Sequence, residues 1–223
     1  MNKEAIYGII DHTLLKATST WEQIKVICEE SIQYKTASIC IPPSFVKQAH
    51  EVYGDKINIC TVIGFPLGYN TTAVKAFEVK EAIQEGANEV DMVINIGWAK
   101  EHKWDLIENE IKTLKEAAGE KILKVIIETC YLTDEEKIEL CGCVTRAGAD
   151  FIKTSTGFGT AGATLHDVEL FAKHVGPKVR IKAAGGMKTK EDIYAFVEAG
   201  ASRLGTSSGI RLLNEEVKSS NTY

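Results

Sequence analysis

EGANEVDM (85–92), RAGADFIK (146–153) and EAGASRLG (198–205) repeat one pattern: a helix end, a turn with glycine and alanine, and the start of a strand. Around these stretches, β-branched apolar runs alternate with amphipathic helical segments at a spacing of roughly 25 residues. Such alternation is typical of a parallel sheet whose strands are joined by crossover helices. The repeated pattern therefore predicts an α/β protein.

Eight runs have the composition of buried strands. They are Tyr7–His12, Thr36–Ile41, Ile57–Ile63, Glu89–Asn95, Leu123–Glu128, Asp150–Lys153, Val179–Ala183 and Ser202–Gly205. Capping residues mark several helices between them. Starts are expected at Thr20, Thr71, Thr133 and Thr189, and ends at Gly86, Gly148 and Gly200.

The number of strand–helix units favours a closed barrel over an open sheet. A doubly wound sheet usually has fewer strands and a glycine-rich first turn, whereas the first turn here, DHTLLK (11–16), has no glycine. A (β/α)8 TIM barrel routinely occupies a chain of 223 residues as one domain. We therefore expect one α/β TIM-barrel domain over residues 1–223, with a C-terminal tail over about residues 214–223.

Charge and composition restrict the partners. The net charge of −5 argues against nonspecific nucleic-acid binding, which needs a basic face. No apolar stretch approaches the length of a membrane span, and the first residues do not resemble an export signal. The six cysteines are then expected to be reduced thiols in the cytoplasm. The sequence predicts a cytoplasmic protein that binds neither nucleic acid nor membrane.

Ionisable residues gather where the expected strands end. In TIM barrels these C-terminal strand ends and the loops after them build the active site. Asp11 lies at the end of the first strand, Asp91 lies on the fourth, and Lys153 and Lys182 lie on the sixth and seventh. Two lysines at the ends of consecutive strands are hard to explain as solvated surface. We expect them to share one cavity with Asp91.

A pair of neighbouring lysines can activate one of its members. A lysine with the ordinary pKa of ~10.4 is almost always protonated at pH 7, whereas an amine that attacks a carbonyl must be neutral. A second ammonium about 5 Å away, at an effective dielectric of about 20, costs the charged form roughly 3 kcal/mol and lowers the pKa by about 2. The pair therefore predicts a Schiff-base lysine, with Asp91 as a proton relay. The spacing leaves open which lysine attacks.

The glycine-rich loops after the last strands predict a phosphate site. Many TIM barrels hold phosphate with the loops after strands seven and eight, which read AAGGMK (183–188) and GTSSG (205–209) here. Glycines let backbone N–H groups approach an anion, and serine hydroxyls add donors. The expected phosphate contacts are Gly157, Gly159, Gly185, Gly186, Gly205, Ser207 and Ser208.

Seven runs resemble the signature runs of the deoxyribose-phosphate aldolase family, in the order of that family. They are DHTLLK (11–16), TVIGFPLG (61–68), EVDMVINIG (89–97), KVIIET (124–129), ADFIKTSTGF (149–158), IKAAGG (181–186) and LGTSSG (204–209). The resemblance extends from near residue 8 to residue 210. Seven runs in register are far more specific than one short motif.

The resemblance implies the roles of the ionisable residues. Lys153 would be the Schiff-base lysine, Lys182 the second lysine that lowers its pKa, and Asp91 the proton donor and acceptor. It further implies reversible cleavage of 2-deoxy-D-ribose 5-phosphate to D-glyceraldehyde 3-phosphate and acetaldehyde, in deoxyribonucleoside catabolism. A homodimer or homotetramer is expected on the same ground. Phe158 stands where some members carry a lysine, which puts a side-chain contact there in doubt.

Three further residues are candidates for catalytic support. Asp11 could join the charge network, and Cys40 could line the site, although a buried cysteine more often serves packing. Tyr223 could reach the imine if the tail folds back over the strand ends; a frayed terminus is the alternative. The five histidines form no ligand cluster with carboxylates, so we expect no metal and no other cofactor.

Other functions remain open at this stage. A different Schiff-base barrel aldolase, such as a transaldolase-like enzyme, would use ketone donors in place of acetaldehyde. A pyridoxal-phosphate protein also needs a lysine and a phosphate site, and would be yellow. A non-catalytic binding barrel would have no need for Asp91, Lys153 and Lys182 together.

Overall fold

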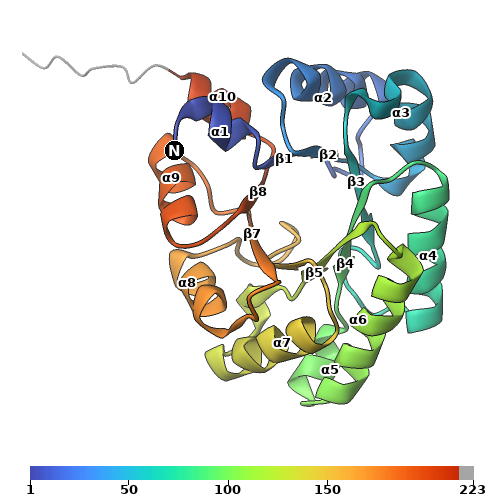
Figure 1. Cartoon of the computed structure of the whole chain (residues 1–223), viewed down its shortest axis with the longest axis vertical. Coiled ribbons are helices and arrows are strands. Elements are labelled where there is room, and N and C mark those ends of the chain that lie inside the picture. Colours follow the sequence, from blue (N-terminus) through green and yellow to red (C-terminus); the bar gives the residue numbers. More distant parts are fainter. Residues whose placement is uncertain (216–223) are drawn as a thin grey trace, which may run out of the picture.

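The computed structural model describes residues 1–215, and they form the predicted TIM barrel. The strands are parallel, pair in chain order and close into a barrel where β1 pairs with β8. They are β1 Ile10–Thr13, β2 Ser38–Cys40, β3 Ile59–Ile63, β4 Glu89–Val93, β5 Ile122–Ile126, β6 Phe151–Lys153, β7 Arg180–Ala184 and β8 Arg203–Thr206. Figure 1 looks down the barrel, with the strands at its centre and the helices around them.

Helices surround the barrel: the first precedes β1, the last follows β8, and the others lie between one strand and the next (Figure 1). They are α1 Lys3–Tyr7, α2 Trp21–Tyr34, α3 Val46–Tyr53, α4 Thr72–Gln84, α5 Ile96–Lys100, α6 Trp104–Ala118, α7 Asp134–Arg146, α8 Leu165–His174, α9 Lys190–Glu198 and α10 Gly209–Asn214. Three short 3-10 turns, η1 Pro43–Phe45, η2 Gly54–Lys56 and η3 Thr129–Tyr131, lie in the loops.

The predicted helix boundaries are confirmed. Thr20, Thr71, Thr133 and Thr189 are the N-cap residues of α2, α4, α7 and α9. At Thr133 the cap is reciprocal: its hydroxyl accepts from the Glu136 N–H, and the Glu136 carboxylate accepts from the Thr133 N–H at 2.8 Å. Gly86, Gly148 and Gly200 directly follow the C-caps of α4, α7 and α9 with positive φ, the conformation that glycine adopts most readily.

The expected first strand was wrong at its start. Tyr7 belongs to the short helix α1, and β1 begins only at Ile10. The Asn2 side chain caps α1 by accepting from the Ala5 N–H at 2.9 Å. Because Ile6 and Tyr7 are buried like the strand residues after them, the apolar run does not reveal where helix ends and strand begins. Other expected strands also extended too far; for example, Asn95 and Glu128 lie beyond the ends of β4 and β5.

Alternation along the strands separates an apolar layer from a charged interior. In β4, Val90 and Met92 belong to the main hydrophobic core. Glu89 and Asp91 point the other way, and both contact the Lys124 ammonium of β5. Successive strand residues face opposite sides of a sheet, so one run of sequence supplies both layers. The interior of this barrel therefore carries charge where many barrels carry branched apolar side chains.

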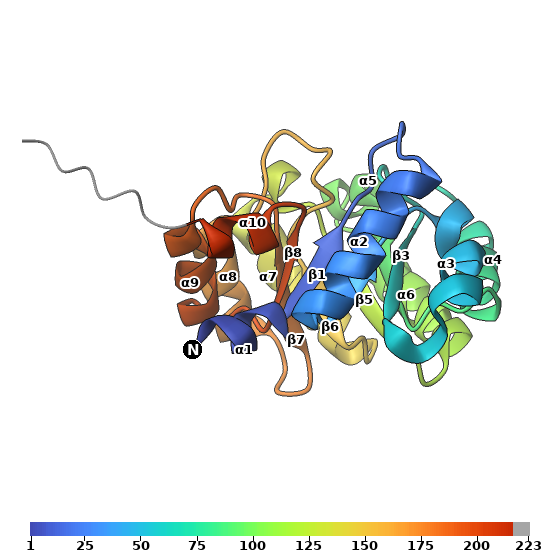
Figure 2. The ribbon, with the colours of Figure 1, turned by 90° about the horizontal axis from the view of Figure 1, so that it is seen from above.

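The loops after the strands rise from one side of the barrel. In Figure 2 the blue loop between β1 and α2 and the orange loop between β6 and α8 stand on the upper side, toward which β1 points. This is the carboxyl-terminal face, where the expected site residues lie. No helix in residues 1–215 has both the length and the apolar character needed to cross a membrane.

Candidate active site

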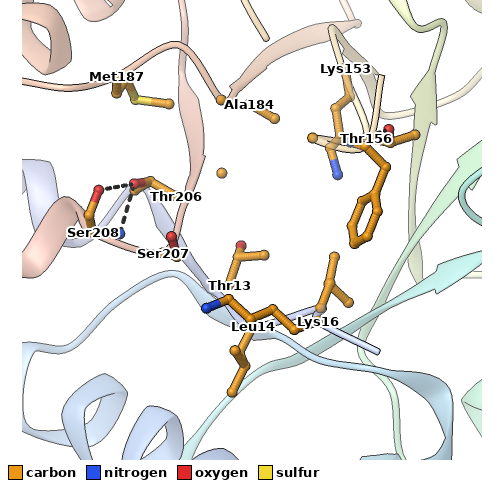
Figure 3. Close-up of a pocket in the computed structure, with 15 residues that line it drawn as sticks. Thr13, Leu14, Lys16, Lys153, Thr156, Ala184, Met187, Thr206, Ser207 and Ser208 are labelled. Carbon is orange, nitrogen blue, oxygen red and sulfur yellow. Dashed lines mark hydrogen bonds between the residues drawn. The ribbon is translucent and has the colours of Figure 1, made fainter. Parts of the chain in front are cut away.

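A cavity of about 450 Å³ opens at the carboxyl-terminal face. Its wall comes from the segments that follow β1, β6, β7 and β8 (Figure 3). Lys153, the last residue of β6, lines this cavity while its side chain remains 4% exposed. Its amine is therefore shielded from bulk water and still reachable from the cavity.

Asp91 connects the two lysines. Its Oδ2 accepts from the Lys153 ammonium at 2.8 Å and from the Lys182 ammonium at 2.7 Å. Its Oδ1 accepts from Lys124 at 2.8 Å and from the Cys60 thiol at 3.1 Å. The structure thus brings Asp91, Lys153 and Lys182 together, and it inserts a carboxylate between the lysines.

Lys182 lies deeper than Lys153. Its side chain is 1% exposed and does not line the cavity. Besides Asp91, it donates to Asp11 Oδ2 in an ion pair. Gly205 of β8 packs against its stem, because a Cβ there would lie 3.1 Å from Lys182 Cε. Lys182 is therefore held within the barrel and away from the place where a substrate can enter.

Three more charged residues belong to the same group, and the sequence analysis did not single them out. Lys124 of β5 contacts Glu89 at 2.6 Å and Asp91 at 2.8 Å. Arg203 of β8 contacts Asp11 at 2.6 Å and Glu89 at 2.9 Å. The sequence did carry a signal for Glu89: it lies two residues before Asp91 in one strand, and residues two apart in a strand face the same side of the sheet. We call the following residues the interior cluster: Asp11, Glu89, Asp91, Lys124, Lys153, Lys182 and Arg203.

The interior cluster fixes the ionisation of its members. Burial alone would raise the pKa of Asp91, but Lys124, Lys153 and Lys182 outweigh it and hold that pKa well below its ordinary value. Burial opposes ionisation of Asp11 as well, and Lys124, Lys182 and Arg203 lower its pKa. Burial would lower the pKa of Lys182, yet Asp11 and Asp91 raise it above the ordinary lysine value. Lys182 is therefore a permanent cation near neutral pH.

The cluster balances its charge without Lys153. Its three carboxylates are matched by three cations other than Lys153, namely Lys124, Lys182 and Arg203. A protonated Lys153 makes the buried group positive, and a neutral Lys153 leaves it balanced. Lys153 is therefore the one cation of the cluster in excess of its three carboxylates.

The expected phosphate residues fall into two groups. Gly157, Gly185, Gly205, Ser207 and Ser208 line the cavity with Lys153. Gly159 and Gly186 do not line it: Gly159 faces the side chains of Cys130 and Glu128, and Gly186 faces the Ala163 carbonyl. Figure 3 shows Ser207 and Ser208 across the cavity from Lys153.

Glu128 holds the segment that follows Lys153. It has a left-handed backbone conformation, with φ of 57°, and its side chain is buried beyond the end of β5. Its carboxylate accepts from the Thr156 hydroxyl at 2.5 Å and from the Thr156 N–H at 3.2 Å. The Thr156 hydroxyl also accepts from the Phe158 N–H at 2.9 Å. Glu128 therefore fixes the part of the cavity wall that Thr156 and Phe158 form.

Cys40 lies inside the barrel beside Cys60 and forms a small apolar cluster with Cys60 and Val62. Cys40, Cys60 and Asp91 have ligand atoms within 4.8 Å of one another, a spacing that a metal ion could use. However, the Lys124 ammonium already contacts Cys60 Sγ at 3.2 Å and Asp91 Oδ1 at 2.8 Å. The place of a cation beside Cys60 and Asp91 is thus taken by an ammonium. Tyr223 lies outside the described residues.

Comparison with known proteins agrees with this architecture. The family model described as "DeoC/LacD family aldolase" matches residues 6–214. The chain belongs to the DeoC/LacD aldolase family. A deoxyribose-phosphate aldolase of Clostridium botulinum (strain Alaska E43 / Type E3) is 61% identical over 216 residues, which cover 97% of this chain and 98% of the relative.

Solved structures of other aldolases share the fold of this DeoC/LacD family member. An aldolase designated QR15 has 38% identity and a TM-score of 0.89, covering 93% of this chain and 94% of the other. A deoxyribose phosphate aldolase from Aeropyrum pernix, described as tetrameric, has 30% identity and a TM-score of 0.86 over 94% and 90% of the two chains. The DeoC/LacD family assignment confirms the resemblance that the seven sequence runs indicated.

Proposed function

We propose that this DeoC/LacD family aldolase reversibly cleaves 2-deoxy-D-ribose 5-phosphate to D-glyceraldehyde 3-phosphate and acetaldehyde through an imine on Lys153. One observation carries the proposal: Lys153 is the only member of the interior cluster that lines the cavity. The cluster thus presents one amine to a substrate, in the position where loss of a proton balances the buried charge. Relatives named deoxyribose-phosphate aldolase at 61% identity support the choice of substrate.

Lys153 acts as the nucleophile in this proposal. Its neutral amine attacks the aldehyde carbon C1 of the open-chain sugar, and water leaves to give the iminium. Lys182 is an electrostatic neighbour and not a nucleophile, since it is buried below the cavity and its pKa is raised by Asp11 and Asp91. Its fixed charge disfavours a second ammonium at Lys153.

Asp91 moves the proton on the Lys153 nitrogen. Its Oδ2 already accepts from that nitrogen at 2.8 Å, so it can take the proton as the amine attacks. The low pKa of Asp91 depends on three lysines, and it rises when Lys153 becomes neutral. The protonated carboxyl can then return the proton when the carbinolamine loses water.

The bond changes balance over one turnover. The C3 hydroxyl loses its proton, the C2–C3 bond breaks, and its electron pair enters the iminium to give an enamine on Lys153. C3 becomes the aldehyde of glyceraldehyde 3-phosphate. Protonation of C2 and addition of water then release acetaldehyde and restore Lys153, so the water lost in forming the iminium is returned.

The phosphate is proposed to bind across the cavity from Lys153. Gly157, Gly185, Gly205, Ser207 and Ser208 line the cavity and can offer backbone N–H groups and hydroxyls. In this arrangement the sugar carbon chain lies between the amine and these donors. Gly159 and Gly186 then serve the geometry of the loops rather than direct contact.

The setting of the reaction is part of the proposal. We place the protein in the cytoplasm, in deoxyribonucleoside catabolism, because its substrate is a phosphorylated intermediate and its cysteines are free thiols in the described residues. We further propose a homodimer or homotetramer; an aldolase from Aeropyrum pernix is described as tetrameric.

Reductive trapping tests the proposal directly. Treatment with acetaldehyde and borohydride should add one ethyl group to Lys153, located by peptide mass mapping. Lys153→Ala should abolish both the label and the cleavage of deoxyribose 5-phosphate while the circular dichroism spectrum stays unchanged. Label on Lys182 alone would refute the assignment of the nucleophile. Trapping only with ketone donors would favour a transaldolase-like enzyme instead.

A further inference from the structure

The charged side chains that line the cavity are all positive. None of the residues that line it, all of them within residues 1–215, is acidic, and two are lysines, Lys16 and Lys153. The β6–α8 loop contributes Thr156, Gly157 and Phe158, none of which is charged. Among the residues that line the cavity, these two lysines are the cations available to an anionic group that enters.

Lys153 is not free to serve an anion. Its ammonium already donates to Asp91 Oδ2 at 2.8 Å, and the proposed reaction requires it as a neutral amine. Lys16, in contrast, makes no side-chain hydrogen bond or ion pair with any residue in the described range 1–215. It lies in the β1–α2 loop and is exposed. The cavity thus has one uncommitted cation.

The backbone around Lys16 is held in place. The Leu14 N–H donates to the Cys40 carbonyl at 2.9 Å, which ties the start of the loop to the end of β2. The Lys16 carbonyl accepts from the Ser19 N–H at 3.0 Å and from the Ser19 hydroxyl at 2.7 Å. These bonds fix the direction from which the Lys16 side chain leaves the chain, without using its ammonium.

The ammonium reaches toward the serines. In Figure 3 the blue side-chain nitrogen of Lys16 lies on the side of the cavity where Ser207 and Ser208 lie, away from Lys153. All four residues line the same cavity. We propose that Lys16 binds the phosphate group of the substrate together with Ser207 and Ser208 and sets the preference for phosphorylated over free sugars. This inference rests on the proposed function, because it names a further residue of that site.

The reaction makes two opposite electrostatic demands: the phosphate of the substrate needs a cation, whereas Lys153 must lose its positive charge. A phosphate monoester carries close to two negative charges at neutral pH, and near Lys153 it would favour the protonated, unreactive amine. A cation at the far side of the cavity attracts the anion away from the nucleophile. A lysine suits this task because its long, flexible stem carries a point charge that can follow the ligand.

Steady-state kinetics on two sugars test the proposal. Lys16→Met keeps the length of the side chain and removes its charge, whereas Lys16→Arg keeps the charge. For 2-deoxyribose 5-phosphate, Lys16→Met should raise KM about tenfold with kcat within a factor of two, and Lys16→Arg should recover most of the loss. For unphosphorylated 2-deoxyribose, kcat/KM should stay unchanged. Lys47→Met, at an exposed position on α3, is the matched control and should behave as the parent.

Binding of inorganic phosphate separates this inference from the proposed function. Titration calorimetry with phosphate should show binding to the parent and to Lys153→Ala, and about tenfold weaker binding to Lys16→Met. The difference should shrink in 1 M salt because exposed charges are screened. Equal affinity of parent and Lys16→Met, or an equal loss of kcat/KM on both sugars, overturns the role of Lys16. If the parent binds phosphate through Lys16 but does not cleave deoxyribose 5-phosphate, only the proposed function fails.

Discussion

Lys153 and Lys182 donate to the same oxygen, Asp91 Oδ2, from adjacent strands at 2.8 and 2.7 Å. The two residues are paired in register between β6 and β7. The lysines do not meet directly, because the carboxylate between them attracts both ammonium groups. The charges of these three groups are therefore coupled, and a change of charge at any one acts on the other two.

Removal of the Lys182 charge should shift the pH dependence of the reaction. In Lys182→Met, Asp91 and Asp11 lose a buried cation, so a proton on Lys153 becomes more favourable. The acid limb of kcat/KM should therefore move to higher pH, by about one unit or more. Lys178→Met, an exposed lysine before β7, is the control. An unchanged profile with near-normal rate would show that Lys182 has no such role.

Acid should weaken the fold through Asp11. Its folded-state pKa lies below the value of ~3.9 for an unfolded aspartate, because Lys124, Lys182 and Arg203 overcome the effect of burial. Such a group stabilises the fold above pH ~4, and this contribution disappears as pH falls through the folded pKa. Urea titrations should show a steeper loss of unfolding free energy below pH ~4 for the parent than for Asp11→Asn. Parallel pH dependences for the two proteins would contradict this.

A second buried ion pair lies outside the barrel, between α4 and α6. The Lys75 ammonium lies 3.0 Å from both oxygens of Glu110 and donates to the Val93 carbonyl at the end of β4 at 2.8 Å. Burial lowers the pKa of Lys75 and raises the pKa of Glu110, so the environment disfavours both charges despite their attraction. Through the bond to Val93, Lys75 ties helix α4 to the end of β4, the strand that carries Asp91.

The two residues should show strong coupling in a double-mutant cycle. Glu110→Gln leaves a buried ammonium without its counter-charge and should cost about 3–5 kcal/mol of unfolding free energy. Lys75→Met is the other single variant, and the double variant Lys75→Met, Glu110→Gln removes both charges and should lose clearly less than the sum of the two single losses. Chemical denaturation measures all four proteins. Additive losses would mean that the charges act independently.

A negative charge at Ser208 should discriminate between sugars. Ser208→Asp places a carboxylate on the cavity wall where the phosphate is proposed to bind. Repulsion should raise KM for deoxyribose 5-phosphate at least tenfold, with a much smaller effect on free deoxyribose. Ser208→Ala is the uncharged control. Equal effects of Ser208→Asp on both sugars would exclude this location for the phosphate.

Tyr223 offers a prediction that comes from the sequence alone, since it lies outside the described residues. A phenol brought to the imine could exchange a proton at the methyl carbon of bound acetaldehyde. Deletion of Tyr223, or Tyr223→Phe, should then slow deuterium exchange into acetaldehyde while borohydride trapping on Lys153 persists. If both variants exchange deuterium at the parental rate, the tyrosine is an incidental terminal residue.

Much of the fold followed from local patterns. Capping threonines and terminal glycines marked the helices because they satisfy groups that every helix end exposes. The boundary near Tyr7 did not follow, since α1 and β1 are both apolar and buried, and only packing separates them. The candidate residues at the strand ends were brought together because parallel strands end at one face.

The sequence by itself determined that Asp91, Lys153 and Lys182 share one end of a barrel, since alternation and strand order depend on near neighbours in the chain. Only the tertiary structure decided which lysine faces the cavity. That choice depends on depth: Lys182 is paired with Asp11 of β1, 171 residues away, and is covered, whereas Lys153 is open on one side. The tertiary structure was also needed to show that Lys124, Glu89 and Arg203 belong to the interior cluster. Their charges are stable in the interior only because strands distant in sequence supply their counter-charges.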